Sequence, residues 1–121
     1  MADTAKSKKV IELANLLDEH NGKDTVVLDI REQSSWTDYF IISTMSSQAH
    51  MRGIIRYVMG FLKENSIELF NRHKNLSESG WVLIDCGDFV VHLMDEQTRE
   101  FYDLERLWYS GKSLYHSSKS S

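Results

Sequence analysis

Two extended runs joined by a two-residue turn constrain the fold of this chain more than any other feature. The runs are Trp81–Cys86 and Phe89–Met94, and Gly87-Asp88 separates them. Glycine at the first turn position suits a type II′ hairpin, because that position needs a positive φ. The residues that flank the turn then pair with each other, and the register of every other pair follows because side chains alternate between faces. The sequence therefore predicts an antiparallel hairpin of fixed register.

The two faces of this hairpin differ in character. One face is wholly apolar and is expected to pack under helices; it carries Val82, Ile84, Cys86, Phe89, Val91 and Leu93. The opposite face, called the mixed face below, combines large apolar groups with an acid and an imidazole; it carries Trp81, Leu83, Asp85, Val90, His92 and Met94. Faces of this composition often bind partners, so the mixed face is the first candidate for a functional surface.

The remaining segments predict helices and further strands. Amphipathic helices are expected at Val10–Leu17, from Met51 to Leu62 after a cap at Ser46 or Ser47, and within Thr98–Trp108. Strands are expected at Thr25–Ile30, at Tyr39–Met45 and, as a short piece, at Ile67–Phe70. No internal repeat interrupts this order.

Length and composition predict one domain and a tail. The chain has 121 residues, of which 41% are hydrophobic and 26% charged, as is typical of a soluble globular domain. We expect this domain over residues 1–110 and a flexible tail over the Ser-, Lys- and Gly-rich residues 111–121. No apolar run is long enough for a signal-peptide core or a membrane span, and the single cysteine fits a reducing compartment. These features favour a cytoplasmic protein without a membrane partner.

The charge balance bears on the kind of partner. The formal net charge is −4, whereas proteins that hold naked nucleic acid through phosphate contacts usually carry an excess of Lys and Arg. An acidic balance favours a basic protein partner or a small molecule. A local basic patch can still coexist with it.

The presence of most potentially reactive side chains can be explained by a structural role. Cys86 falls on the apolar hairpin face, where a thiol stays protonated and behaves as a small hydrophobe. No His or Cys pair has the spacing of metal ligands, which argues against a metal site. His92 is expected instead to hydrogen-bond Asp85 or the backbone, because polar groups of this kind usually satisfy each other. Turn chemistry explains Asp88, whereas structure and function are equally open for Asp38. We therefore expect no metal, no cofactor and no catalytic residue.

Four blocks of residues resemble the Iojap or ribosomal silencing factor family in order and spacing. They are Leu28-Asp29-Ile30-Arg31, then Ser35-Trp36-Thr37-Asp38-Tyr39-Phe40-Ile41-Ile42, then Trp81-x-Leu83-x-Asp85-x-Gly87-Asp88-x-Val90-Val91-His92, then Arg99-Glu100-Phe101-Tyr102-x-Leu104-Glu105-x-Leu107-Trp108. The resemblance runs from the first helix to Trp108. The chain departs from it at Met45, where many relatives have glycine, and in the Ser-rich end after Gly111.

The resemblance implies an α/β fold, with a mixed β-sheet flanked by helices. The architecture is similar to that of nucleotidyltransferases, but their Gly-Ser and paired-aspartate catalytic set is missing. It also implies a protein that is not an enzyme, that binds ribosomal protein fourteen of the large subunit, and that blocks subunit joining to repress translation when nutrients are scarce. The expected contact residues are Trp81, Leu83, Asp85, Asp88, His92, Met94 and Glu105. No sequence-specific contact with nucleic acid is expected, and weak self-association through the hairpin edge is left open.

Two other functions remain as alternatives. An enzyme of the nucleotidyltransferase type would use Asp85, Asp88 and Asp38 to hold a divalent metal and a nucleotide. A direct RNA-binding assembly factor would lose affinity steeply as salt is raised.

Overall fold

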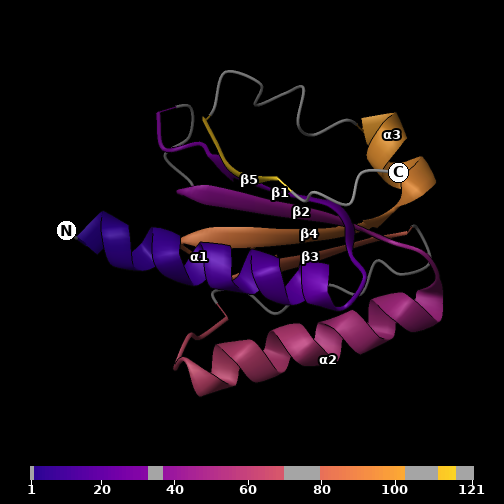
Figure 1. Ribbon diagram of the computed structural model, residues 1–121, viewed down its shortest axis with the longest axis horizontal. Coiled ribbons are helices and arrows are strands. Elements are labelled where there is room, and N and C mark those ends of the chain that lie inside the picture. The colour runs from indigo at the N-terminus through magenta and orange to yellow at the C-terminus, as the bar shows by residue number, and fades with distance from the viewer. Residues whose placement is uncertain (1, 33–36, 70–79, 103–111, 117–121) are drawn as a thin grey trace.

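The computed structural model describes residues 2–32, 37–69, 80–102 and 112–116. Within these ranges the chain forms five strands and three helices (Figure 1). The strands are β1 (Lys23–Asp29), β2 (Tyr39–Met45), β3 (Trp81–Asp85), β4 (Phe89–Asp95) and β5 (Lys112–His116). The helices are α1 (Ala2–Glu19), α2 (Gln48–Glu64) and α3 (Glu96–Tyr102). None of these helices is long and apolar enough to cross a bilayer.

The strands make one mixed sheet in the order β3-β4-β2-β1-β5. β2 and β4 run parallel, and every other neighbouring pair is antiparallel. The parallel pair needs a crossover connection, because parallel neighbours cannot be joined by a tight turn, and α2 lies within that connection. The expected α/β class, with a mixed sheet flanked by helices, is confirmed.

Helix α2 begins and ends through identifiable caps. Ser47 is the N-cap, and its Oγ accepts a hydrogen bond of 3.0 Å from the His50 N–H. At the other end Ser66 has a φ of +55°, and its N–H donates to the Lys63 carbonyl oxygen. The N–H of Ile67 then donates to the Leu62 carbonyl oxygen over 2.8 Å, which completes a Schellman motif.

This motif corrects the short strand expected at Ile67–Phe70. Residues 67–69 form no strand, and residue 70 lies outside the described residues. Ile67 instead turns back on the end of α2 and packs, partly buried, against the core beneath the helices. Its β-branched side chain therefore serves the hydrophobic contact of a helix terminus.

The flexible tail expected over residues 111–121 is wrong for Lys112–His116. This segment is β5, which pairs antiparallel with β1 from Val26↔His116 to Asp29↔Lys112. The main-chain ladder offered by β1 orders the segment, although its polar composition suggested a solvated end. Residues 117–121 lie outside the described residues, as do residues 103–108 of the helix expected within Thr98–Trp108.

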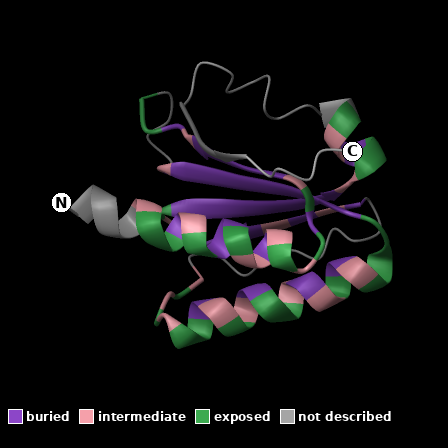
Figure 2. Ribbon diagram, in the orientation of Figure 1, coloured by how far each residue is buried: buried purple, intermediate pink, exposed green. Residues whose placement is uncertain are grey.

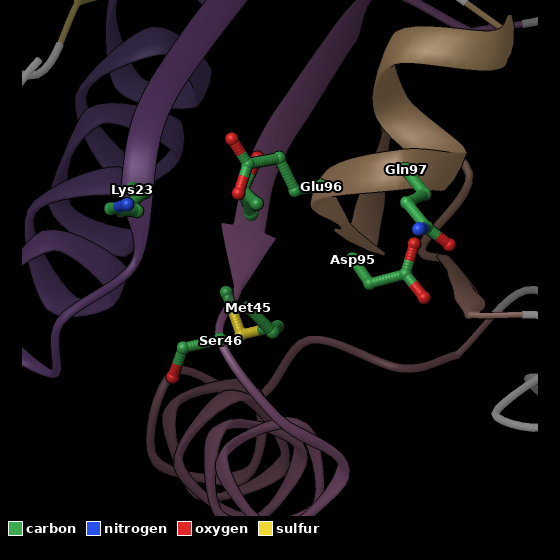
Figure 3. Close-up of a pocket in the computed structure, with 7 residues that line it drawn as sticks. Lys23, Met45, Ser46, Asp95, Glu96 and Gln97 are labelled. Atoms are coloured by element: carbon green, nitrogen blue, oxygen red, sulfur yellow. The ribbon is translucent and has the colours of Figure 1, made fainter. Parts of the chain in front are cut away.

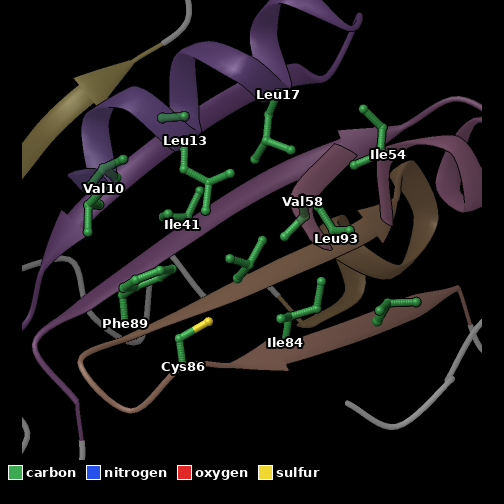
Figure 4. Packing of buried hydrophobic residues seen from close by; sticks show 14 of the residues in the cluster. Val10, Leu13, Leu17, Ile41, Ile54, Val58, Ile84, Cys86, Phe89 and Leu93 are labelled. Atoms are coloured by element: carbon green, nitrogen blue, oxygen red, sulfur yellow. The ribbon is translucent and has the colours of Figure 1, made fainter. Parts of the chain in front are cut away.

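The inner strands β1, β2 and β4 are largely buried on both faces of the sheet, as Figure 2 shows. The first core lies between the sheet and helices α1 and α2. In Figure 4, side chains of these helices, among them Leu13 and Val58, point towards side chains of the strands such as Leu93. The apolar hairpin face belongs entirely to this core, as expected. The second core lies on the other face and consists of Val26, Leu28, Ile30, Phe40, Ile42, Val90 and Met94.

Candidate functional site

The hairpin that carries the mixed face has the predicted register. Trp81 pairs with Met94, Leu83 with His92 and Asp85 with Val90. The Cys86 N–H donates to the Phe89 carbonyl oxygen over 2.9 Å, so the two turn residues are those expected. Gly87 has a φ of +83°, a backbone conformation that favours glycine.

Polar contacts hold this turn against the start of β2. Thr37 Oγ1 donates to the Gly87 carbonyl oxygen over 2.9 Å, and the Asp38 N–H donates to the Asp88 carbonyl oxygen over 3.0 Å. Asp85 Oδ1 accepts the Gly87 N–H over 2.9 Å from within the hairpin. The backbone of Asp38 therefore has a structural role, and these three hydrogen bonds together hold the turn in place.

A contact between Trp81 and His92 organises the centre of the mixed face. The Trp81 indole Nε1–H donates to His92 Nδ1 over 3.2 Å, and the His92 ring also meets Phe40 edge-on with centroids 4.5 Å apart. Burial lowers the pKa of the His92 imidazole to about 3. The neutral ring therefore carries its proton on Nε2, because Nδ1 is the acceptor. This corrects the expectation that His92 bonds Asp85 or the backbone: its partner is Trp81, and Asp85 holds the turn instead.

The predicted contact residues differ in their exposure. Trp81 and Leu83 are half-buried and Asp88 is exposed. Three others are buried within the chain, with exposed fractions of 4% for Asp85, 2% for His92 and 0% for Met94. Glu105 lies outside the described residues. Trp81, Leu83 and Asp88 thus keep exposed surface on the hairpin, whereas Asp85, His92 and Met94 are buried beneath it.

Comparisons with known proteins decide the family. The family model described as "Ribosomal silencing factor during starvation" matches residues 3–120. This chain belongs to the ribosomal silencing factor family. The matched residues include β5, which agrees with its place in the sheet.

Relatives and a solved structure agree with this family assignment. The ribosomal silencing factor RsfS of Bacillus subtilis is 32% identical over 102 residues, which cover 84% of this chain and 86% of that protein. A mouse protein named mitochondrial assembly of ribosomal large subunit protein 1 is 31% identical over 79% of this chain, but the match covers only 43% of that longer protein. A crystal structure of a Chromobacterium violaceum protein superposes with a TM-score of 0.74 and 30% identity, covering 95% of this chain and 92% of that one.

The cysteine of this ribosomal silencing factor family member is a core residue. Cys86 is buried in the first core, as expected. Burial, together with smaller contributions from the nearby carboxylates of Asp85 and Asp88, raises the pKa of its thiol to about 12. A thiol with so little thiolate at neutral pH is a poor nucleophile.

A polar hollow lies at the far end of the sheet from the hairpin turn (Figure 3). It has a volume of about 280 Å³ and is lined by Lys23, Thr44, Met45, Ser46, Asp95, Glu96 and Gln97. Asp95 already uses Oδ1 to accept the Thr98 N–H over 2.8 Å. The acids named for a nucleotidyltransferase site lie at the turn end and do not line this hollow. Among the described residues, no three His, Cys, Asp or Glu side chains are grouped as metal ligands.

Proposed function

We propose that this chain binds the large ribosomal subunit and represses translation by hindering its association with the small subunit. Membership of the ribosomal silencing factor family supports this role, as does the name of the mouse relative, which refers to assembly of the large subunit. The protein acts as a binding protein in the cytoplasm, without catalysing a reaction. The observation that carries the proposal is the half-exposed Trp81 on an edge strand, fixed in place by His92.

A preorganised aromatic side chain is a strong anchor for a protein partner. Tryptophan is enriched among the few residues that dominate binding energy, especially where it loses little freedom on binding. The hydrogen bond to His92 restricts the Trp81 indole before any partner arrives. Leu83 lies two residues further along the same face and extends the apolar contact. Asp88, exposed at the turn, adds a carboxylate that suits a basic ribosomal protein.

The partner within the subunit is ribosomal protein fourteen in this proposal. Trp81, Leu83 and Asp88 make direct contacts, and Glu105 adds a further negative charge. The three buried residues act indirectly in this proposal. Asp85 holds the turn, His92 holds the Trp81 indole, and Met94 packs within the sheet. A bulky domain seated on this surface would occupy the space that the small subunit needs, so repression under nutrient limitation is steric.

Sedimentation with purified ribosomal subunits tests the proposal. The wild-type chain should co-sediment with large subunits and reduce the fraction of joined particles when small subunits are added. Trp81→Ala and Asp88→Lys should weaken both effects. Glu19→Lys is the matched control, since it makes the same charge change at an exposed site on α1. Circular dichroism melts verify that each variant is folded.

The results separate the parts of the proposal. Failure of the wild-type chain to bind large subunits would overturn the function itself. Binding to subunits without binding to isolated ribosomal protein fourteen would overturn only the choice of partner. Equal binding by Asp88→Lys and Glu19→Lys would exclude the hairpin turn from the interface.

A further inference from the structure

The exposed cations of α2 form a single row along the helix. Arg52, Arg56 and Lys63 are all exposed, and with 3.6 residues per turn they fall within about 40° of one another around the axis. The row extends about 16 Å along the helix, at about 1.5 Å per residue. Glu64 is the single acidic residue of α2, and the first turn has none. One side of the helix is thus basic in a chain whose net charge is −4.

These three cations have no partner in the part of the chain that the structure describes. Other cations do have partners: Arg31 forms a 2.7 Å ion pair with Asp29, and Arg99 donates to Thr44 Oγ1 over 2.9 Å. By contrast, no hydrogen bond or ion pair within the described residues involves a side chain of the row. Within the described residues, nothing neutralises these three charges, so an external anion is a suitable partner for them.

Two glycines beside the row leave the backbone of α2 uncovered by side chains. Gly53 and Gly60 are two turns apart on α2, and a Cβ built on either would meet nothing within 4 Å. Internal packing therefore does not require glycine at these positions, although glycine is a poorer helix former than alanine. Their absence of a side chain lets the backbone of another molecule approach the helix closely.

The row and the hairpin anchor lie on opposite faces of the sheet, because α2 packs on the first core and Trp81 packs on the second. Tyr57 stacks on His20 of α1 with ring centroids 3.7 Å apart, and Arg56 comes about 100° earlier around the helix, on the side away from α1. In Figure 1 the strands follow one another from β5 to β3, and α2 lies at the β3 end of this series. The exposed side of α2 in Figure 2 faces outward there. A partner seated along β3 can meet Trp81 on one flank and the row on the other.

We propose that this row binds the phosphate backbone of ribosomal RNA, across the β3 edge of the sheet from the protein contact made by the hairpin. This inference rests on the proposed function. Guanidinium groups match phosphate oxygens in bidentate geometry, and two of the three cations are arginines. Phosphate contacts of this kind carry no sequence information, and the uncovered backbone at Gly53 and Gly60 admits a sugar–phosphate chain. Three cations on an acidic protein bind RNA weakly alone, so the contact acts together with the hairpin.

The dependence of affinity on salt tests this inference. The affinity of the full chain for purified large subunits is measured from about 50 to about 200 mM KCl, because each neutralised phosphate adds about 0.7 to 0.9 to the slope of log affinity against log salt. The triple variant Arg52→Gln, Arg56→Gln, Lys63→Gln should lower that slope by about 2 to 3. The control variant Lys8→Gln, Lys9→Gln, Lys23→Gln removes the same charge from exposed sites on α1 and β1 and should keep the wild-type slope.

Each outcome has a distinct meaning. A selective fall in slope for the α2 variant supports RNA contact. Weaker binding with a slope change below about 1 would identify an acidic protein surface instead, since such a surface releases few condensed counterions, and would overturn the RNA assignment. Equal behaviour of the two triple variants would show that the row makes no contact. In both of these cases wild-type binding would leave the proposed function standing, whereas no wild-type binding at all would refute that function.

Discussion

The indole N–H of Trp81 donates to Nδ1 of His92 over 3.2 Å, so a tryptophan on the edge strand is held by a histidine on the inner strand. The bond requires a neutral imidazole, because a protonated Nδ1 cannot accept. His92 Nε2 is buried and has no hydrogen-bond partner in the described structure. The placement of the proposed anchor is thus coupled to the protonation of one buried ring.

This coupling predicts a loss of stability in mild acid. The pKa of His92 is about 3 in the folded chain, against an ordinary value of 6.5. Between these values the unfolded state binds more protons, so the stabilising contribution is complete above pH 6.5 and is lost as pH falls towards 3. At about pH 5 the free energy of unfolding should be lower by about 2 kcal/mol than at neutral pH from this group alone.

Urea unfolding of the wild type and His92→Phe checks this expectation. Both proteins are unfolded at about pH 7.5 and about pH 5, and the loss on acidification should be smaller in the variant. The difference between the two proteins isolates His92 from the other histidines. An equal loss in both would mean that this ring does not cause the acid sensitivity.

Asp85 should stabilise the hairpin turn more than its neighbour Asp88 does. Asp85→Ala removes the acceptor of the Gly87 N–H and should lower the free energy of unfolding by about 1–3 kcal/mol. Asp85→Asn keeps an oxygen in the same place and should lose less. Asp88→Ala, at an exposed site, should change stability by about 0.5 kcal/mol or less. Chemical denaturation of the three variants makes the comparison, and equal losses for both alanine variants would contradict the turn contact.

Cys86 should resist alkylation in the folded chain. With a pKa of about 12, its thiolate is a minute fraction at about pH 8, and the side chain is buried as well. Iodoacetamide should label the native protein very slowly and the urea-unfolded protein fully, as mass spectrometry can measure. Rapid labelling under native conditions would place the thiol at the surface.

The hairpin was predictable because one local feature fixes it. Gly87 sets the turn, and side-chain alternation then assigns every residue of both strands to a face. Burial on the mixed face could not be predicted in the same way. β4 lies inside the sheet beside β2, which buries His92 and Met94, whereas β3 lies at the edge and leaves Trp81 half-exposed. Side-chain alternation along a strand can be predicted from the sequence, whereas the burial of each side chain depends also on where that strand lies in the sheet.

β5 escaped prediction for a different physical reason. Its residues 112–116 lack the β-branched pattern that identifies the inner strands, and their order comes from pairing with β1. The basic row was also overlooked, although its spacing is readable in the sequence. The signal is the recurrence of Arg52, Arg56 and Lys63 at four and eleven residues, which places three cations on one side of α2. Net charge alone concealed this local asymmetry.

The glycines of α2 predict a conflict between stability and binding. Gly53→Ala and Gly60→Ala add methyl groups into open space, so each should stabilise the helix by about 0.5–1 kcal/mol. The same methyl groups would stand between the helix and an RNA backbone and should weaken binding to large subunits. Ser66→Gly is the control, because glycine suits its φ of +55° and should also raise stability, at a site off the basic row.

Thermal melts and subunit sedimentation of these variants distinguish two explanations for the glycines. If the Gly53→Ala, Gly60→Ala protein melts higher yet binds less, while Ser66→Gly melts higher and binds normally, close approach of a partner explains why the helix tolerates two poor helix formers. If the alanine variant binds as well as the wild type, the two glycines only lower the stability of α2 and do not serve binding. In that case the RNA contact would rest on the three cations alone, without a close approach to the helix.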